Sequence, residues 1–317
     1  PPNLIFVSNV PIELCHAAVR YANKNNIPVV VDVRDLWPDI YADLLPGFFK
    51  IIVKPLQYIL SKYSGKLNVS LSNATAITGL TKSYLNWGLS KAKRKKIKYD
   101  RVFPFCYPKS INISSKLIRH IYNKLKITKK DIIALYTGNI GYQSDFNNII
   151  YTAQMLEKKH PNLKFVISGS GPKLNYLKEL SKKSSNIIFT GWLDDKEIKT
   201  LLHLSTFGLI PFYPKLNYLL NIPNKFSEYL AYGLVICCNL GGEMGSLVKK
   251  HNCGFIYNSE KPNDLQKKIS RLINDSKKIK KISKNSKWLH NKSFDNESIN
   301  AKFVSYIETF VKNFAKN

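Results

Sequence analysis

Short runs of apolar residues alternate along this chain with stretches in which apolar residues recur every three or four positions. The runs have the length of buried strands, and the stretches have the period of amphipathic helices. In the first third of the chain, strands are predicted at Leu4–Val7, Val29–Val33, Ala74–Thr78 and near Lys98–Phe103. Helices are predicted between them, at Pro11–Lys24, around Phe48–Tyr63 and near Thr81–Asn86. Alternation of this kind is typical of an α/β fold with a parallel sheet.

The alternation pauses at Pro104–Ser115, a polar segment with two prolines that we interpret as a linker, and then starts again. The strands predicted in the second part are Ile132–Thr137, Lys164–Ile167, Ile187–Thr190, Phe207–Pro211, Val235–Cys238 and Gly254–Tyr257. Helical patterns at Asp264–Asn274 and Ser298–Phe314 close the chain. We therefore expect two Rossmann-like domains with a cleft between them.

The predicted boundaries are 1–110 for the N-terminal domain and 111–297 for the second domain, followed by a C-terminal helix at 298–317 that packs back toward the first domain. The second domain has six predicted strands, whereas the first has three or four. Doubly wound sheets usually carry about five or six strands. The N-terminal domain is therefore predicted to be incomplete, without its opening βα units.

The composition of the chain excludes several classes of protein. The chain has 317 residues and is 44% apolar, so it can bury a core, and disorder is excluded. It has no uncharged apolar run long enough for a spanning helix and no signal peptide, and its five cysteines are expected to be reduced thiols. These features predict a cytoplasmic protein.

The formal net charge is +28, from 49 basic and 21 acidic residues. Most of the basic residues are lysines and they are spread along the whole chain, which is typical of an AT-rich genome as much as of a function. We expect no nucleic-acid partner. Nucleotide phosphates and an anionic membrane surface are the candidate partners that this charge favours.

Two glycine-containing turns follow predicted strands of the second domain. One contains Thr137, Gly138 and Asn139, and the other is Ser168-Gly-Ser-Gly171-Pro172. In parallel sheets ligands bind at the carboxyl ends of the strands, where glycine lets a backbone N–H approach a phosphate. Plain tight turns are the alternative. A third dinucleotide-type glycine and a P-loop are both absent from the sequence, which disfavours hydride transfer and ATP hydrolysis.

The most informative stretch is Asn221-Ile-Pro-Asn-Lys-Phe-Ser-Glu-Tyr-Leu-Ala-Tyr-Gly233, which predicts a loop and a short helix carrying Lys225 and Glu228. A lysine in the first helical turn opposes the helix dipole unless an anion also binds there. A carboxylate one turn later can accept two hydrogen bonds from a ribose diol. The alternative is a solvated Lys–Glu pair. Further on, Gly241 and Gly242 open another helix and offer a second anion nest.

These pieces together resemble the GT-B glycosyltransferases, specifically the large retaining family 4. The matching segments are Tyr136-Thr-Gly-Asn-Ile140, Ile167-Ser-Gly-Ser-Gly-Pro172, Phe189-Thr-Gly-Trp192, Pro223-Asn-Lys-Phe-Ser-Glu-Tyr-Leu-Ala-Tyr-Gly233 and Gly241-Gly242. In the first half, Val31-Asp-Val-Arg-Asp-Leu-Trp-Pro-Asp39 is similar to a stretch of the bacterial fucosamine-type transferases of surface-polysaccharide clusters. The chain departs from the general family at Leu220, where the earlier of two paired glutamates would stand, and at Asn139 and Ser144, where the usual diphosphate-binding Arg and Lys would stand.

The resemblance implies a retaining transfer of a sugar, an amino-deoxyhexose, from a UDP-sugar to a lipid-linked saccharide in O-antigen or capsule biosynthesis, with no metal cofactor. It implies catalytic roles for Arg34, Asp35 and Lys225. The residues that it implies for nucleotide-sugar binding are Gly138, Asn139, Gly171, Trp192, Asn224, Lys225, Glu228, Gly241 and Gly242. For Arg34 and Asp35 the alternative is a mutual ion pair that stabilises the following turn.

Lysines also suggest a membrane-facing surface in the N-terminal part. Lys50, Lys54 and Lys62 fall on one face of the helix predicted around Phe48–Tyr63, and Lys91-Ala-Lys-Arg-Lys-Lys-Ile-Lys98 is a second basic tract. Both suit a peripheral protein on the inner face of the cell membrane. The alternative is a sheet-covering helix with a solvated lysine stripe. For the whole chain, two other functions stay open, namely a nucleotide-sugar 2-epimerase and a catalytically silent, truncated protein that only binds nucleotide.

Overall fold

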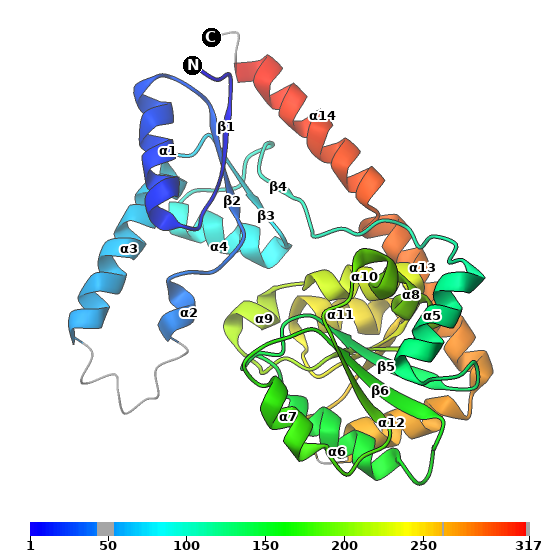
Figure 1. Ribbon diagram of the computed structural model, residues 1–317. Helices are drawn as coiled ribbons and strands as arrows, with labels where there is room; N and C mark the ends of the chain where they lie inside the picture. Colours follow the sequence, from blue (N-terminus) through cyan, green and yellow to red (C-terminus); the bar gives the residue numbers. More distant parts are fainter. Residues whose placement is uncertain (43–53, 262, 315–317) are drawn as a thin grey trace. The chain divides into compact units, whose positions relative to one another are not determined.

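The computed structural model describes residues 1–42, 54–261 and 263–314 (Figure 1). The chain forms two compact units, each with its own parallel sheet. Unit 1 comprises Pro1–Phe105, Lys215–Ile222 and Glu297–Asn317, and unit 2 comprises Cys106–Pro214 and Pro223–Asn296. The predicted α/β class with two Rossmann-like domains is confirmed.

The sheet of unit 1 has four parallel strands in the order β1-β2-β3-β4. They are β1 (Ile5–Ser8), β2 (Val29–Val33), β3 (Ala76–Gly79) and β4 (Arg101–Val102). In the register, Val31 of β2 lies between Val7 of β1 and Ile77 of β3. All five residues of β2 are buried, as expected for an inner strand that is covered on both faces.

Side chains that alternate along β2 pack against helices on opposite faces of this sheet. Val29, Val31 and Val33 share a core with the helices that connect the strands. These helices are α1 (Ile12–Lys24), α3 (Lys54–Ser72) and α4 (Lys82–Ala92), and the short α2 (Asp39–Ala42) follows β2. Val30 lies on the other face and packs with Phe310 of α14 (Asn296–Phe314). The short α9 (Leu216–Leu220) also belongs to unit 1.

Three elements of unit 1 differ in extent from their predictions. Helix α3 runs on through Gly65 to Ser72, because Leu67 and Leu71 pack into the core. Helix α4 continues to Ala92 for the same reason. Strand β4 is shorter than Lys98–Phe103, because the Asp100 carboxylate accepts from the Ile97 amide (2.8 Å) and closes a turn before the strand. Residues 48–53 of the helix predicted at Phe48–Tyr63, including Lys50, lie outside the described residues.

The sheet of unit 2 has six parallel strands in the order β10-β9-β8-β5-β6-β7. All six were predicted: β5 (Ile132–Thr137), β6 (Leu163–Ser168), β7 (Ile187–Gly191), β8 (Phe207–Ile210), β9 (Val235–Cys238) and β10 (Gly254–Ile256). From β5 the chain proceeds outward to β6 and β7 and then returns to place β8 on the other side of β5. This reversal is a topological switch point, where open α/β sheets bind ligands at the carboxyl ends of the strands.

Helices cover both faces of this sheet (Figure 1). They are α5 (Ser115–Leu125), α6 (Phe146–Leu156), α7 (Leu174–Leu180), α8 (Asp195–Leu204), α10 (Asn224–Tyr232), α11 (Gly242–His251), α12 (Asp264–Ile273) and α13 (Ser276–Ser293). The five cysteines are free thiols. Over residues 1–42, 54–261 and 263–314, no helix is long and apolar enough to cross a bilayer.

Candidate functional site

A cavity of about 550 Å³ opens at the carboxyl ends of β5, β6 and β7 in unit 2. Three segments that follow these strands and the first turn of α10 form its wall. The lining residues are Thr137, Gly138, Asn139, Ser168, Gly169, Ser170, Trp192, Leu193, Ile198, Asn224, Lys225 and Glu228. The cavity therefore lies at the strand ends beside the switch point, where this topology places a ligand.

Backbone hydrogen bonds tie the three loops together. Gly138 N donates to Ser168 O (3.0 Å), Ile140 N donates to Ser170 O (2.8 Å) and Gly169 N donates to Gly191 O (2.8 Å). Gly169 has a φ of +131°, and a Cβ built on it would lie 2.0 Å from the carbonyl oxygen of Gly138. Only glycine fits this close approach, so the glycines here hold loops against each other.

Lys225 projects from the first turn of α10, which begins without a side-chain cap. Its ammonium lies 3.7 Å from the ring centroid of Tyr136 and 5.3 Å from that of Phe212. Its Nζ also lies 3.6 Å from the position that a Cβ of Gly138 would occupy. Within the described part of the chain, no carboxylate lies within ion-pair distance of Lys225. Burial lowers the pKa of Lys225 to about 7, against the opposing charge of Glu228.

Glu228 follows one turn later on α10 and lines the same cavity. Burial raises the pKa of Glu228, while the charge of Lys225 and the Thr137 side chain act in the opposite direction. A solvated Lys–Glu ion pair does not describe these residues, because both line the cavity half-buried and no such pair forms. The Lys225 ammonium thus has no carboxylate partner among the described residues, and the Glu228 carboxylate has a hydrogen bond with the Thr137 side chain. A polar ligand in the cavity would add partners to both.

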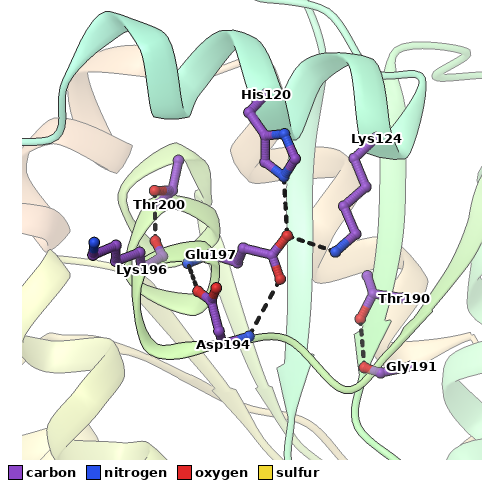
Figure 2. A network of polar contacts seen from close by, with 8 residues as sticks. All are labelled: His120, Lys124, Thr190, Gly191, Asp194, Lys196, Glu197 and Thr200. Atoms are coloured by element: carbon purple, nitrogen blue, oxygen red, sulfur yellow. Dashed lines mark hydrogen bonds and ion pairs between the residues drawn. The ribbon is translucent and has the colours of Figure 1, made fainter.

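A polar network fixes the start of α8, which carries the wall residue Ile198 (Figure 2). Asp194 and Glu197 form a capping box, with Glu197 N donating to Asp194 Oδ1 (2.8 Å). Glu197 Oε1 also contacts His120 Nε2 (3.0 Å) and accepts from Lys124 Nζ (2.5 Å), both on α5. The hydrogen bond from Lys124 is the main cause that lowers the pKa of Glu197 to about 2. This network secures the segment that follows Trp192 and Leu193.

A family comparison bears directly on this unit. The family model described as "Glycosyl transferases group 1" matches residues 118–288, which is more than half of the chain. The chain belongs to this family. The matched region spans β5 to β10 and every residue that lines the cavity. A comparison with curated proteins finds no match.

Solved structures of glycosyltransferases share the fold of this group 1 transferase. Anabaena HepE in complex with UDP and glucose is 14% identical, with 97% of this chain and 78% of that chain covered and a TM-score of 0.70. Sucrose-phosphate synthase of Thermosynechococcus elongatus is 15% identical, with 99% and 74% covered and a TM-score of 0.68. WaaG, involved in lipopolysaccharide biosynthesis, is 14% identical, with 90% and 81% covered and a TM-score of 0.67. These likenesses establish the GT-B fold.

Of the residues implied for nucleotide-sugar binding, six line the cavity of the transferase, namely Gly138, Asn139, Trp192, Asn224, Lys225 and Glu228. Gly171, Gly241 and Gly242 do not. A Cβ on Gly171 would lie 2.5 Å from Ile140 O, so this glycine lets two loops pack together. Gly241 and Gly242 stand at the start of α11, where Gly241 has open space around it.

Arg34 and Asp35 belong to unit 1, after β2. Arg34 Nε donates to the buried Asp32 carboxylate, and the guanidinium lies 5.5 Å from the ring centroid of Phe105. Asp35 Oδ1 accepts from the Leu36 amide (2.7 Å), and burial raises the pKa of the Asp35 carboxyl. The ion partner of Arg34 is therefore Asp32, so the alternative of an Arg34–Asp35 pair is wrong.

Several wall residues are not among those that the resemblance implies for nucleotide-sugar binding, namely Thr137, Ser168, Gly169, Ser170, Leu193 and Ile198. Ser168, Gly169 and Ser170 stand in the turn Ser168-Gly-Ser-Gly171-Pro172, of which only Gly171 is among the implied binding residues. The signal that finds them is position, because the first residues after a parallel strand are those at the sheet edge. Ile198 carries no such signal, since only the packing of α8 places it.

Among the described residues, no group of three histidine, cysteine or acidic side chains is arranged to hold a metal ion.

Proposed function

We propose that this group 1 glycosyl transferase moves a sugar from a UDP-sugar to a saccharide acceptor, with retention of configuration. Membership of the family supports sugar transfer from a nucleotide sugar. The observation that carries the proposal is the cavity of about 550 Å³ that joins glycine-containing loops, Lys225 and Glu228 at the strand ends. HepE, which shares the fold, is known in complex with UDP and with UDP-glucose.

The diphosphate is assigned to Lys225 and to backbone amides around it. The Gly138 and Ile140 amides are already engaged with the neighbouring loop, whereas the Asn139 amide lies between them at the cavity wall. The free backbone amides of Asn224 and Lys225 stand at the start of α10, where they and the helix dipole favour a bound anion. An anion bound there would raise the pKa of Lys225, because a negative neighbour favours the ammonium form.

The ribose is assigned to Glu228, whose carboxylate can accept hydrogen bonds from both hydroxyls of the diol. The base is assigned to the backbone near Trp192. The Trp192 side chain itself is 78% exposed, so its indole contributes little to holding a ligand in the cavity. The cavity volume falls in the range that small-molecule ligands usually occupy, about 300–1,000 Å³.

The chemical demand of the transfer is charge stabilisation. As the bond between the sugar and the diphosphate breaks, negative charge develops on the diphosphate and positive charge on the sugar ring. Lys225 and the amides meet the developing negative charge, and we propose that they do so without a metal. Arg34 and Asp35 are proposed to orient the acceptor or the transferred sugar.

The acceptor is proposed to be a lipid-linked saccharide on the inner face of the cytoplasmic membrane, and the sugar an amino-deoxyhexose of an O-antigen or capsule. Two features support this proposal. The Arg34-Asp35-Leu-Trp-Pro38 stretch resembles that subgroup, and WaaG, which shares the fold, is involved in lipopolysaccharide biosynthesis. The exposed lysines Lys93, Lys95, Lys96 and Lys98 would favour an anionic surface.

The test is a calorimetric titration of the full chain with UDP, GDP and a panel of UDP-sugars, followed by analysis of the products. We expect UDP to bind with a dissociation constant below about 1 mM, and transfer to give a product with the anomeric configuration of the donor. UDP binding without transfer to any lipid-linked acceptor would instead indicate a silent nucleotide-binding protein. Interconversion of two UDP-sugars would indicate the epimerase.

A further inference from the structure

A second cavity, of about 760 Å³, lies within unit 1 and shares no residue with the nucleotide cavity of unit 2. One wall is β4 with the residues beside it, and the other is one side of α14. The lining residues are Lys98, Tyr99, Arg101, Val102, Phe103, Ala301, Lys302, Ser305, Tyr306, Thr309 and Asn313. Lys98 is one of the lysines proposed above to favour an anionic surface, and neither the family match at residues 118–288 nor the proposed transfer assigns the others a role.

The charged residues of this lining are all cations, namely Lys98, Arg101 and Lys302. Within the described residues, none of the three forms an ion pair. The nearby Asp100 carboxylate does not neutralise them, because it is held by two bonds from the Arg94 guanidinium (2.7 and 2.8 Å). Three unbalanced positive charges around one cavity create a local potential that attracts anions.

Three aromatic residues, Tyr99, Phe103 and Tyr306, form another part of the wall. The Phe103 and Tyr306 rings pack at 5.2 Å between centroids, and Tyr99 packs on Phe310 of the core at 5.2 Å. The Lys98 ammonium lies 4.8 Å from the centroid of the Tyr99 ring. The cavity therefore offers positive charge and a preformed apolar surface side by side, which suits a ligand with an anionic group and an apolar part.

Hydrogen-bonding groups complete the α14 side of the cavity. Ser305, Thr309 and Asn313 are four residues apart and so lie along one stripe of the helix. The Tyr306 hydroxyl oxygen is buried and has no hydrogen-bond partner among the residues that the structure describes. An acceptor oxygen that reached it would satisfy this donor, which is otherwise costly to bury.

We propose that this cavity binds an organic phosphate, with the phosphate held by Lys98, Arg101 and Lys302 and the apolar body on Tyr99, Phe103 and Tyr306. Such a ligand could be the headgroup region of an anionic phospholipid or a soluble phosphate ester. The neighbouring surface favours the lipid, because it combines exposed lysines with an exposed apolar side chain. Lys93, Lys95 and Lys96 are exposed, and Ile97, which precedes the lining residue Lys98 in sequence, is 42% exposed.

The test is an NMR titration of the full chain with two probes, short-chain dihexanoyl phosphatidylglycerol below its micelle concentration and glycerol 3-phosphate. We expect amide signals of residues 98–103 and 301–313 to shift with at least one probe, while those of residues 137–139 identify any binding in the nucleotide cavity. Saturation by phosphatidylglycerol but not by glycerol 3-phosphate would assign the site to a lipid. Equal saturation by both probes would assign it to soluble phosphate esters.

Two variants with equal losses of charge locate the binding. The triple change Lys98→Gln, Arg101→Gln and Lys302→Gln should weaken binding at least about tenfold, since it removes charge-assisted hydrogen bonds. The matched control changes Lys93, Lys95 and Lys96 to Gln and should change the affinity less than about twofold, because exposed lysines outside the cavity contribute mainly screened attraction. Should the cavity triple fail to fold, Lys302→Gln alone, on the surface of α14, should still weaken binding measurably.

The proposal would be overturned by equal losses from both triples, which would mean that the charge acts diffusely. Absence of shifts at residues 98–103 and 301–313 with both probes would overturn it as well. Either result leaves the proposed transferase function untouched, because UDP binding is followed through separate signals at residues 137–139 and 168–170.

Discussion

Asp100 in unit 1 is fully buried and Lys225 in unit 2 is half-buried, and the two charged side chains differ in their partners. Burial would raise the pKa of Asp100, but hydrogen bonds from Arg94 and from the Ile97 and Ile77 amides lower it below its ordinary value. Burial lowers the pKa of Lys225 to about 7, and its ammonium lies over the rings of Tyr136 and Phe212. Asp100 is fully partnered within the fold, whereas Lys225 is not.

This difference separates a structural charge from one that is positioned for a ligand. A buried charge with its hydrogen bonds complete fixes the segment around it, here the turn before β4. A buried charge without such partners destabilises the empty protein and regains stability when an anion enters. The two kinds of charge should therefore respond oppositely to substitution.

The largest effect is expected on stability in unit 1. Asp100→Asn removes the charge that Arg94 and two backbone amides contact, and breaking one side of a buried pair costs about 3–5 kcal/mol. Urea unfolding of the full chain measures this loss. The control Asp195→Asn removes an exposed carboxylate that pairs with Lys199 and should cost less than about 1 kcal/mol. Similar costs for the two variants would show that Asp100 is not the structural charge described above.

The same Asp100 contacts predict a pH dependence. Its folded pKa lies below the ordinary value of 3.8, so the stabilisation is present above pH 3.8 and is lost as the pH falls through the folded pKa. Urea midpoints measured between pH 5 and pH 2 should therefore fall more for the native chain than for Asp100→Asn. Parallel curves for the two proteins would contradict the lowered pKa.

In unit 2, Lys225→Met should weaken ligand binding without lowering stability, the opposite of the result expected for Asp100→Asn. The affinity for UDP should fall about 100-fold, because the diphosphate loses a charge-assisted hydrogen bond worth about 1.5–3 kcal/mol. The free energy of unfolding should stay constant or rise, since a poorly solvated ammonium is removed. Calorimetry and urea unfolding measure the two quantities, with the exposed Lys250→Met as the control for loss of charge. A variant that binds UDP normally but is less stable would make Lys225 a structural residue.

Glu228→Gln should weaken UDP binding about tenfold, because a neutral amide accepts hydrogen bonds from a ribose diol less strongly than a carboxylate. Titration with 2′-deoxy-UDP gives the second arm of a double-mutant cycle. Part of the loss should disappear with the deoxy ligand, since one of the two hydroxyls is gone. Equal losses with both ligands would place Glu228 elsewhere than on the 2′-hydroxyl.

Trp192→Ala should have the smallest effect, a change of less than about threefold in UDP affinity. The base is assigned to the backbone near this residue, and the indole is 78% exposed. A much larger loss, measured by the same calorimetry, would mean that the base stacks on the indole instead.

The sequence predicts the sheet of unit 2 more fully than it predicts unit 1. The strands Ile132–Thr137 and Val235–Cys238 have the predicted limits, because each lies in a compact apolar run that is followed directly by a glycine or a polar residue. In unit 1, the extent of α3 is set by packing of Leu67 and Leu71, which local sequence around Gly65 does not reveal. Helix α9 lies in sequence between elements of unit 2 yet belongs to unit 1, where Tyr84 Oη donates to Asn217 Oδ1 (2.5 Å).

For the site, position at a strand end indicated Gly138 and Asn139, and residue type in the first turns of a predicted helix indicated Lys225 and Glu228. All four line the cavity. The same reasoning could not separate a glycine that lines a cavity from one that allows two loops to meet, as at Gly171. Nor could it show that Lys225 lies on aromatic rings, because Tyr136 and Phe212 are far from it in sequence. Such contacts depend on tertiary structure alone.

The central claim is that Lys225 binds the diphosphate of the ligand. The number of protons that the protein takes up when UDP binds tests this claim most directly. Calorimetry at pH 7.5 to 8.5, repeated in buffers of different ionisation enthalpy, measures the protons taken up, since Lys225 has a pKa of about 7 without ligand. A bound diphosphate raises that pKa, so the native chain should take up close to one proton per UDP, and its affinity should fall as the pH rises above 7. Lys225→Met should show neither behaviour. Binding of UDP to the native chain with no proton uptake and a flat pH profile would contradict the account.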